Sequence, residues 1–158
     1  MLISEALEFA TDKLSAAGVL SPSVDAELLG CFILDTDRSE LTLLAISNQE
    51  FPENKLAQFL VAVERREKRE PLQHITGIAP FRHLELEVGP GVFIPRPETE
   101  QVVDLAIQKT KHVPAPLVVD LCAGSGAIAI SIGTEVSSAT VYAAVSYTHL
   151  TLPTNREV

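Results

Sequence analysis

Residues 117–127 read Leu-Val-Val-Asp-Leu-Cys-Ala-Gly-Ser-Gly-Ala, and this stretch gives the clearest indication of the fold class. The continuous apolar run over 117–121 predicts a buried parallel strand, and the small residues after it predict a tight turn. A helix over 128–132 and a second strand over 140–144 follow. Together they predict the first strand–turn–helix–strand unit of a doubly wound α/β sheet. Ligands of such sheets bind beyond the carboxyl ends of the strands.

The two glycines of this turn suit a ligand site. Gly124 and Gly126 let the backbone approach a ligand closely, and the helix N-terminus that follows offers amides to a carboxylate or phosphate. The spacing also passes as a dinucleotide fingerprint, G-x-G-x-x-A. Asp120, however, ends the strand where an acid suits an ammonium group, and the order D-L-x-x-G-x-G resembles the turn of S-adenosylmethionine-dependent methyltransferases. The turn alone leaves a methyltransferase and a nicotinamide enzyme both open.

Upstream, residues 1–70 predict a small bundle of helices. Helices are expected over 3–17, from Pro22 after a Ser21 cap, over 39–46 and over 52–69. The residues expected to face the core are Ile3, Ala6, Leu7, Ala10, Leu14 and Ala17 in the first helix, Val24, Leu28, Cys31 and Phe32 in the second, and Leu56, Phe59, Leu60 and Val63 in the last. The charged run over 64–70 is expected to be a solvated face with i,i+4 pairs.

Pro71 ends the helical pattern, and a different period follows. A strand over 81–88 is expected to pair with a short strand over 92–94, which gives a β-hairpin within 78–94. Residues 95–97, Pro-Arg-Pro, predict a rigid elbow, because each proline fixes its own φ and biases the residue before it away from helix. A helix over 98–110 follows. Its inward side chains are expected to be Val102, Val103, Leu105, Ala106 and Ile107.

Three ordered motifs resemble those of the release-factor glutamine methyltransferase family, also called HemK-like. Residues 70–77, E-P-L-Q-H-I-T-G, resemble its E-P-x-x-H/Y-x-T-G signature. Residues 93–100, F-I-P-R-P-E-T-E, resemble its elbow, and residues 119–129 resemble its cofactor turn. The S-P-x-x-D-A-E start over 21–27 also fits the family's helical N-terminal domain. The resemblance extends over about residues 1–144.

The resemblance implies an α plus α/β architecture in four parts. Residues 1–70 would be a helical substrate-recognition domain, and residues 71–97 a β-hairpin linker. Residues 98–144 would begin a Rossmann-like methyltransferase domain, as its first strand–helix–strand unit only. Residues 145–158 resemble nothing in the family and are expected to be a foreign tail.

The resemblance also implies a reaction and a site. Family members use S-adenosyl-L-methionine to methylate the glutamine side chain in the Gly-Gly-Gln motif of peptide chain release factors. Residues that resemblance places at the cofactor are Asp120, Cys122, Ala123, Gly124, Ser125 and Gly126 of the turn, and Arg96, Glu98 and Glu100 of the elbow. The turn would contact the methionine part, with Asp120 supporting it, and the elbow would lie near the cofactor edge. Alternatively, Arg96 and Glu100 form a surface ion pair that only fixes the elbow.

The sequence departs from the family in two places. The Asn-Pro-Pro-Tyr motif, which positions the poorly nucleophilic amide nitrogen, is absent from the 158 residues. Val145 stands where an acid would hold the ribose hydroxyls. No catalytic residue is therefore assigned, and we expect this chain alone not to transfer a methyl group. We also expect the strand over 117–121 to lack a neighbour at one edge, which favours aggregation.

Composition narrows the classes of partner. The chain carries 12 basic and 21 acidic residues, a formal net charge of −9, which disfavours a broad nucleic-acid or anionic-lipid surface. Two distant cysteines and no signal-like N-terminus predict a cytoplasmic protein, and we expect a monomer. The four histidines show no metal-ligand spacing, so no metal site is expected. The alternatives are a release-factor-binding helical module without catalysis, a nucleic-acid amino-group methyltransferase and a nicotinamide oxidoreductase.

Overall fold

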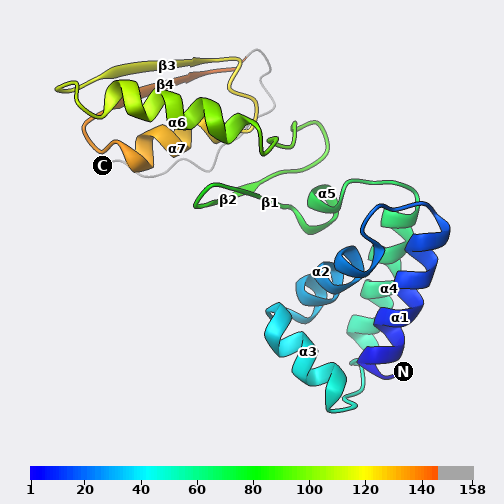
Figure 1. Ribbon diagram of the computed structural model, residues 1–158. Coiled ribbons are helices and arrows are strands. Elements are labelled where there is room, and N and C mark those ends of the chain that lie inside the picture. The colour runs from blue at the N-terminus through cyan, green and yellow to red at the C-terminus, as the bar shows by residue number, and fades with distance from the viewer. Residues whose placement is uncertain (146–158) are drawn as a thin grey trace. The chain divides into compact units, whose positions relative to one another are not determined.

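The computed structural model describes residues 1–145, and the chain divides into two compact units. The helical unit runs from Met1 to Thr76, and the sheet unit begins at Gly77. The helical unit contains α1 (Ile3–Ala16), α2 (Pro22–Leu34), α3 (Arg38–Ile46), α4 (Glu53–Glu67) and α5 (Leu72–Thr76) (Figure 1). The sheet unit contains β1 (Ile78–Phe81), β2 (Leu84–Glu87), α6 (Thr99–Thr110), β3 (Leu117–Leu121), α7 (Ala127–Glu135) and β4 (Thr140–Ala144). The predicted α plus α/β architecture is confirmed in this order of elements.

The core of the helical unit lies between α1, α2 and α4. The predicted faces of α1 and α4 are confirmed, because Ile3, Ala6, Ala10, Leu14, Phe59 and Val63 are all buried. The rings of Phe51 and Phe59 pack with their centroids 5.1 Å apart. Gly18, with φ of +72°, follows α1 and ends the helix.

The predicted core face of α2 is wrong in part, although Cys31 packs against the core as predicted. Val24 and Phe32 are exposed, whereas Ala26, Leu29 and Gly30 are buried against the neighbouring helices. This helix is apolar on most of its circumference, so periodicity could not determine which side faces inward. Pro22 takes the first helical position after Ser21, as predicted, but the Ser21 side chain makes no capping hydrogen bond.

The charged run over 64–70 is also more than a solvated face. The Arg66 Nε donates to Asp25 Oδ2 of α2 at 2.7 Å, and both side chains are largely buried. The Arg69 Nη1 donates to the Gly18 carbonyl at the end of α1. Arg65 holds the Glu70 carboxylate through two hydrogen bonds. Only the exposed Lys68–Glu64 pair follows the i,i+4 pattern among the described ion pairs. The end of α4 therefore fastens α1, α2 and the segment that leads into α5.

The β-hairpin of the sheet unit differs from the prediction. β1 pairs antiparallel with β2, with Ile78 opposite Glu87 and Phe81 opposite Leu84, so the turn is Arg82-His83. Residues 92–94, the predicted partner strand, are not a strand. Phe81 and Leu86 belong to a buried core with Val103, Ala127, Ile132 and Val136. The hairpin therefore contributes to the core that also contains α6 and α7.

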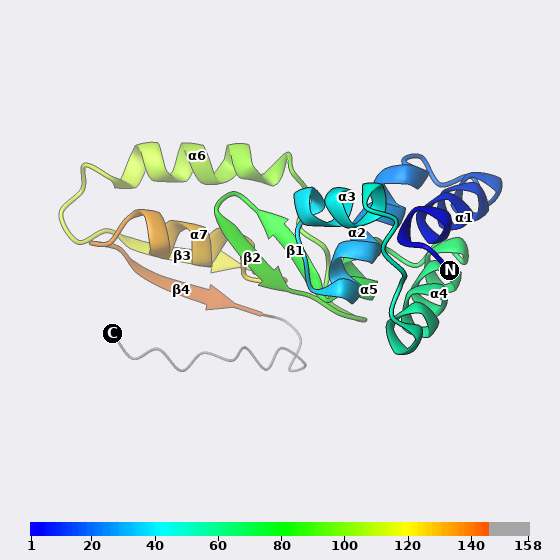
Figure 2. The ribbon, with the colours of Figure 1, turned by 90° about the horizontal axis from the view of Figure 1, so that it is seen from below.

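β3 and β4 form a parallel pair, in register from Leu117 opposite Thr140 to Leu121 opposite Ala144 (Figure 2). This confirms the predicted strand–helix–strand unit. The prediction that β3 is buried is wrong for one face: Leu117, Val119 and Leu121 are exposed, because α7 packs on the opposite face. Within residues 1–145, β3 pairs with β4 alone. In α6, Val103 is buried but Val102 and Leu105 are exposed, so that helix has fewer inward residues than predicted.

Candidate cofactor-binding site

The turn over 122–126 joins the carboxyl end of β3 to the N-terminus of α7. Three alternate residues, Cys122, Gly124 and Gly126, have positive φ values of 64°, 56° and 78°. The Ala123 N–H donates to the Ala144 carbonyl at 3.0 Å, and the Gly126 N–H donates to the Ala123 carbonyl at 2.8 Å. The turn is thus tied to the end of β4, and it lies at the strand edge where ligands of parallel sheets bind.

The two glycines of this turn are favoured for different physical reasons. A Cβ on Gly126 would lie 3.2 Å from the Ile130 Cδ1 atom, so packing and the positive φ both oppose a side chain there. At Gly124 a Cβ would meet nothing closer than 3.9 Å, so only the backbone conformation favours glycine. Cys122 adopts the same left-handed region with a side chain, an uncommon conformation that occurs often at binding sites.

Asp120 occupies the end of β3, where the sequence predicted an acid near the ligand. Its side chain is buried, and Oδ2 accepts the Ala129 N–H of α7 at 3.2 Å. Burial raises the pKa of this carboxyl, and the hydrogen bond from Ala129 opposes that rise. Asp120 therefore satisfies one of the first amides of α7, and the Ala127 and Ile128 amides begin the helix without an i−4 partner.

The three elbow residues, Arg96, Glu98 and Glu100, have different surroundings. The Arg96 guanidinium lies 5.4 Å from the centre of the Phe93 ring, and both residues are exposed. Glu98 is exposed and directly precedes α6. Glu100, in the first turn of α6, accepts the Arg82 N–H at 2.9 Å through Oε1. None of the ion pairs within residues 1–145 joins Arg96 to Glu100, so the predicted alternative of a surface pair between them is wrong.

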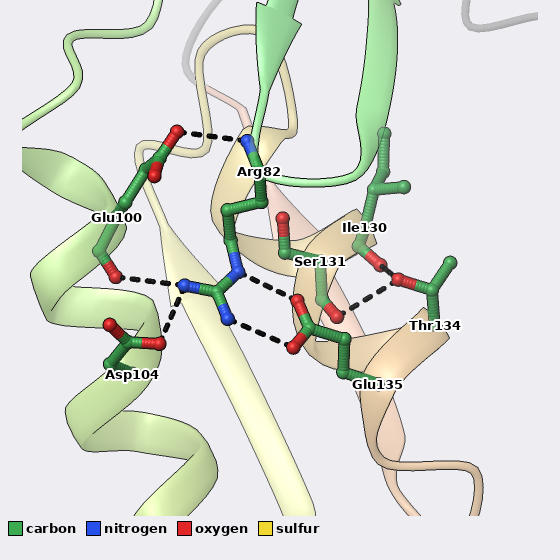
Figure 3. A network of polar contacts seen from close by, with 7 residues as sticks. All are labelled: Arg82, Glu100, Asp104, Ile130, Ser131, Thr134 and Glu135. Carbon is green, nitrogen blue, oxygen red and sulfur yellow. Dashed lines mark hydrogen bonds and ion pairs between the residues drawn. The ribbon is translucent and has the colours of Figure 1, made fainter.

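The structure brings the turn residues together, since they are consecutive and tied to β4. It places no hydrogen bond or ion pair between that turn and the elbow in the described part of the chain. The residues that sequence reasoning missed lie around Arg82 (Figure 3). Its guanidinium contacts Glu135 of α7 and Asp104 of α6. No local pattern marks this cluster, because its members lie 22 and 53 residues from Arg82.

Among residues 1–145 no group of three or more His, Cys, Asp or Glu side chains is placed to hold a metal ion. No helix in the same part of the chain has the length and apolar character needed to cross a membrane.

Comparison with known proteins finds a matching domain model and similar sequences. Residues 5–77 match the model of the PrmC N-terminal domain. The chain is 48% identical to the release factor glutamine methyltransferase of Streptomyces coelicolor, with 90% of this chain and 49% of that protein aligned. It is 47% identical to that of Bifidobacterium longum and 48% identical to that of Corynebacterium glutamicum, each over 90% of this chain and 50% of the relative. The chain spans about half the length of these curated relatives. By sequence, this chain resembles about half of each of these release factor glutamine methyltransferases, and the resemblance extends over 90% of its own length.

Proposed function

We propose that the protein to which this chain belongs transfers a methyl group from S-adenosyl-L-methionine to the glutamine side chain in the Gly-Gly-Gln motif of release factors. One observation carries the proposal: the left-handed glycine turn lies at the carboxyl end of β3, in a chain that resembles relatives named for this reaction over 90% of its length. Within that reaction, we assign cofactor binding to the turn and to Asp120.

The chemistry of the turn suits the amino-acid part of the cofactor. A carboxylate is stabilised by amides at a helix N-terminus, and the Ala127 and Ile128 amides are available there by their position in α7. An ammonium group is stabilised by a carboxylate, and one oxygen of Asp120 accepts the Ala129 amide while the other remains for a ligand. When bound, the cofactor supplies a methyl group on a sulfonium. We assign direct approach to the cofactor to Cys122, Ala123, Gly124, Ser125 and Gly126.

The elbow divides between two roles in this proposal. Arg96 and Glu98 are exposed and remain the elbow residues assigned to the cofactor edge. Glu100 is engaged with Arg82, so we assign it to holding the elbow in place. At the end of β4 the exposed Val145 offers no carboxylate for ribose hydroxyls.

The substrate amide sets a separate requirement. Its nitrogen lone pair is delocalised into the carbonyl, so transfer needs groups that hold the amide in line with the methyl. The Asn-Pro-Pro-Tyr motif that does this in the family does not occur in the 158 residues. We therefore expect this chain to bind the cofactor and a release factor without methylating it.

Calorimetric titration of S-adenosyl-L-methionine into the purified chain tests the cofactor assignment. We expect measurable binding, and its loss in Gly124→Val, because a β-branched residue is strained at positive φ. Gly89→Val is the matched control, since Gly89 has an ordinary φ and open space around the position of a Cβ. Binding that survives Gly124→Val but not Gly89→Val would contradict the assignment to the turn.

The release-factor assignment has its own experiment. The tagged full chain should retain a purified release factor, and mass spectrometry of the retained factor should show unmodified glutamine in the presence of the cofactor. Retention without cofactor binding would instead favour a recognition module made by the helical unit, which has its own buried core. Methylated glutamine would refute the expectation that this chain alone is inactive.

We also propose that the protein is a cytoplasmic monomer that does not bind nucleic acid directly.

A further inference from the structure

Arg82 makes four side-chain hydrogen bonds in the described part of the sheet unit. It lies in the two-residue turn between β1 and β2, and its side chain is 11% exposed. Nε and Nη2 donate to the two oxygens of Glu135 at 2.6 and 2.9 Å, which is the paired geometry that a guanidinium makes with a carboxylate. Nη1 donates to Asp104 Oδ1 at 2.6 Å and to the Glu100 carbonyl at 3.2 Å.

The backbone of Arg82 adds a further contact. Its N–H donates to Glu100 Oε1 at 2.9 Å, and its φ of +54° is the left-handed conformation that a tight hairpin turn requires. Arg82 therefore contacts Glu100 twice, once from its backbone and once from its side chain. Figure 3 shows the guanidinium between α6 and α7, with Glu100 and Asp104 on one side and Glu135 on the other.

These partners connect Arg82 to both segments of the candidate site. Glu100 ends the elbow sequence over 93–100 and lies in the first turn of α6, so its position limits where Arg96 and Glu98 can lie. Glu135 ends α7, the helix whose N-terminus continues the glycine turn.

We propose that Arg82 is a positioning residue for cofactor binding, which holds the elbow and the glycine turn in fixed relation through Glu100 and Glu135. This inference rests on the proposed function, because it assumes that both segments serve the cofactor. Arg82 itself touches neither Cys122–Gly126 nor Arg96, so its effect passes through the two helices. A lysine at this position has one ammonium and cannot reproduce the paired contact with Glu135 together with the contact to Asp104.

Hydrogen exchange and calorimetry on the full chain test the inference. The variants are Arg82→Gln, Arg82→Lys and the matched control Lys109→Gln, which removes one positive charge from an exposed position of α6. In Arg82→Gln we expect faster amide exchange over both 93–100 and 122–130, and a Kd for S-adenosyl-L-methionine at least tenfold higher than in the wild type. Arg82→Lys should lie between the two, and Lys109→Gln should match the wild type. Kd is measured at a temperature where circular dichroism shows every variant folded.

The possible outcomes test two separate claims, the positioning role of Arg82 and the cofactor assignment. Faster exchange confined to the hairpin over 78–87, or an unchanged Kd in a folded Arg82→Gln, would overturn the positioning role and leave Arg82 as a purely structural contact. If Arg82→Gln does not fold, amide exchange and the Kd for S-adenosyl-L-methionine are measured on Arg82→Lys instead. A wild-type chain that shows no cofactor binding would defeat the cofactor assignment in the proposed function. In that case exchange over 93–100 and 122–130 still decides whether Arg82 holds the two segments together.

Discussion

The buried ion pair between Asp25 and Arg66 offers a quantitative test of how the helical unit is held together. The Arg66 Nε lies 2.7 Å from Asp25 Oδ2, and the two side chains are 17% and 12% exposed. Nη1 of Arg66 also donates to the Glu70 carbonyl at 2.8 Å. Replacing Arg66 with methionine keeps most of the side-chain volume but leaves a buried carboxylate on α2 without its partner.

The magnitude follows from that unpaired charge. Removing one partner of a buried pair costs roughly 3–5 kcal/mol, a large part of the roughly 5–15 kcal/mol by which domains are stable. Replacing both partners with apolar residues is often close to neutral. We therefore expect Arg66→Met to lower the free energy of unfolding by about 3 kcal/mol or more, and the double variant Asp25→Leu, Arg66→Met to recover most of that loss.

Urea unfolding of the full chain, followed by circular dichroism at 222 nm, measures these differences. Hydrogen exchange then assigns the loss to α2 and α4. Lys68→Met is the matched control on the same stretch, since the Lys68–Glu64 pair is exposed, and its urea midpoint should not move measurably. A loss below about 1 kcal/mol for Arg66→Met, or a double variant as unstable as the single one, would show that the Asp25 carboxylate does not depend on Arg66.

Three further predictions concern the sheet unit. Ser131→Ala should raise the melting temperature, because the Ser131 Oγ is buried without a hydrogen-bond partner and such a group costs about 1–3 kcal/mol; a lower melting temperature would show that the hydroxyl is satisfied. Gly126→Ala should lower the free energy of unfolding by about 1–3 kcal/mol, because φ is +78° and a Cβ would lie 3.2 Å from Ile130; urea unfolding measures the loss. Arg82 holds the pKa of Glu135 below its ordinary value of 4.5, with His83 acting in the same direction and Asp104 against it. The stability that Glu135 contributes should therefore be present above about pH 4.5 and disappear as the pH falls through the lowered pKa, so urea midpoints of wild type and Glu135→Gln should converge in acid. A gap that stays constant down to pH 3 would contradict this pairing.

The parts of the fold that could be predicted are those indicated by residues that are close together in the sequence. The apolar run over 117–121, the glycine turn and the following helix are consecutive, so the strand–helix–strand unit could be read directly. The faces of α1 and α4 could be read because apolar and charged residues alternate clearly along them. The buried face of α2 could not be predicted, because its apolar residues surround the helix. Only contact with α1 and α4 selects Ala26 and Leu29.

The hairpin could not be predicted, because its turn lacks the usual signal. Gly89-Pro90-Gly91 is the strongest turn pattern nearby, and it predicted that the chain reverses there, between strands over 81–88 and 92–94. The chain instead reverses at Arg82-His83, where Arg82 adopts a positive φ without being glycine. Contacts with Glu100, Asp104 and Glu135 accompany that conformation, and all three partners are distant in sequence. Local turn chemistry therefore gave no information about this reversal.

The elbow motif shows the same difference between local sequence signals and contacts with residues that are distant in sequence. Resemblance assigned Arg96, Glu98 and Glu100 together, because they stand in one continuous signature. In the structure α6 begins at Thr99, so Glu100 is a helical residue that faces the hairpin, whereas Arg96 precedes the helix and stays exposed beside Phe93. One motif thus contains a residue that bonds to the hairpin, Glu100, and residues that stay exposed, Arg96 and Glu98. A sequence signature gives the positions, but the start of the helix decides which of them bonds to the hairpin and which stay exposed.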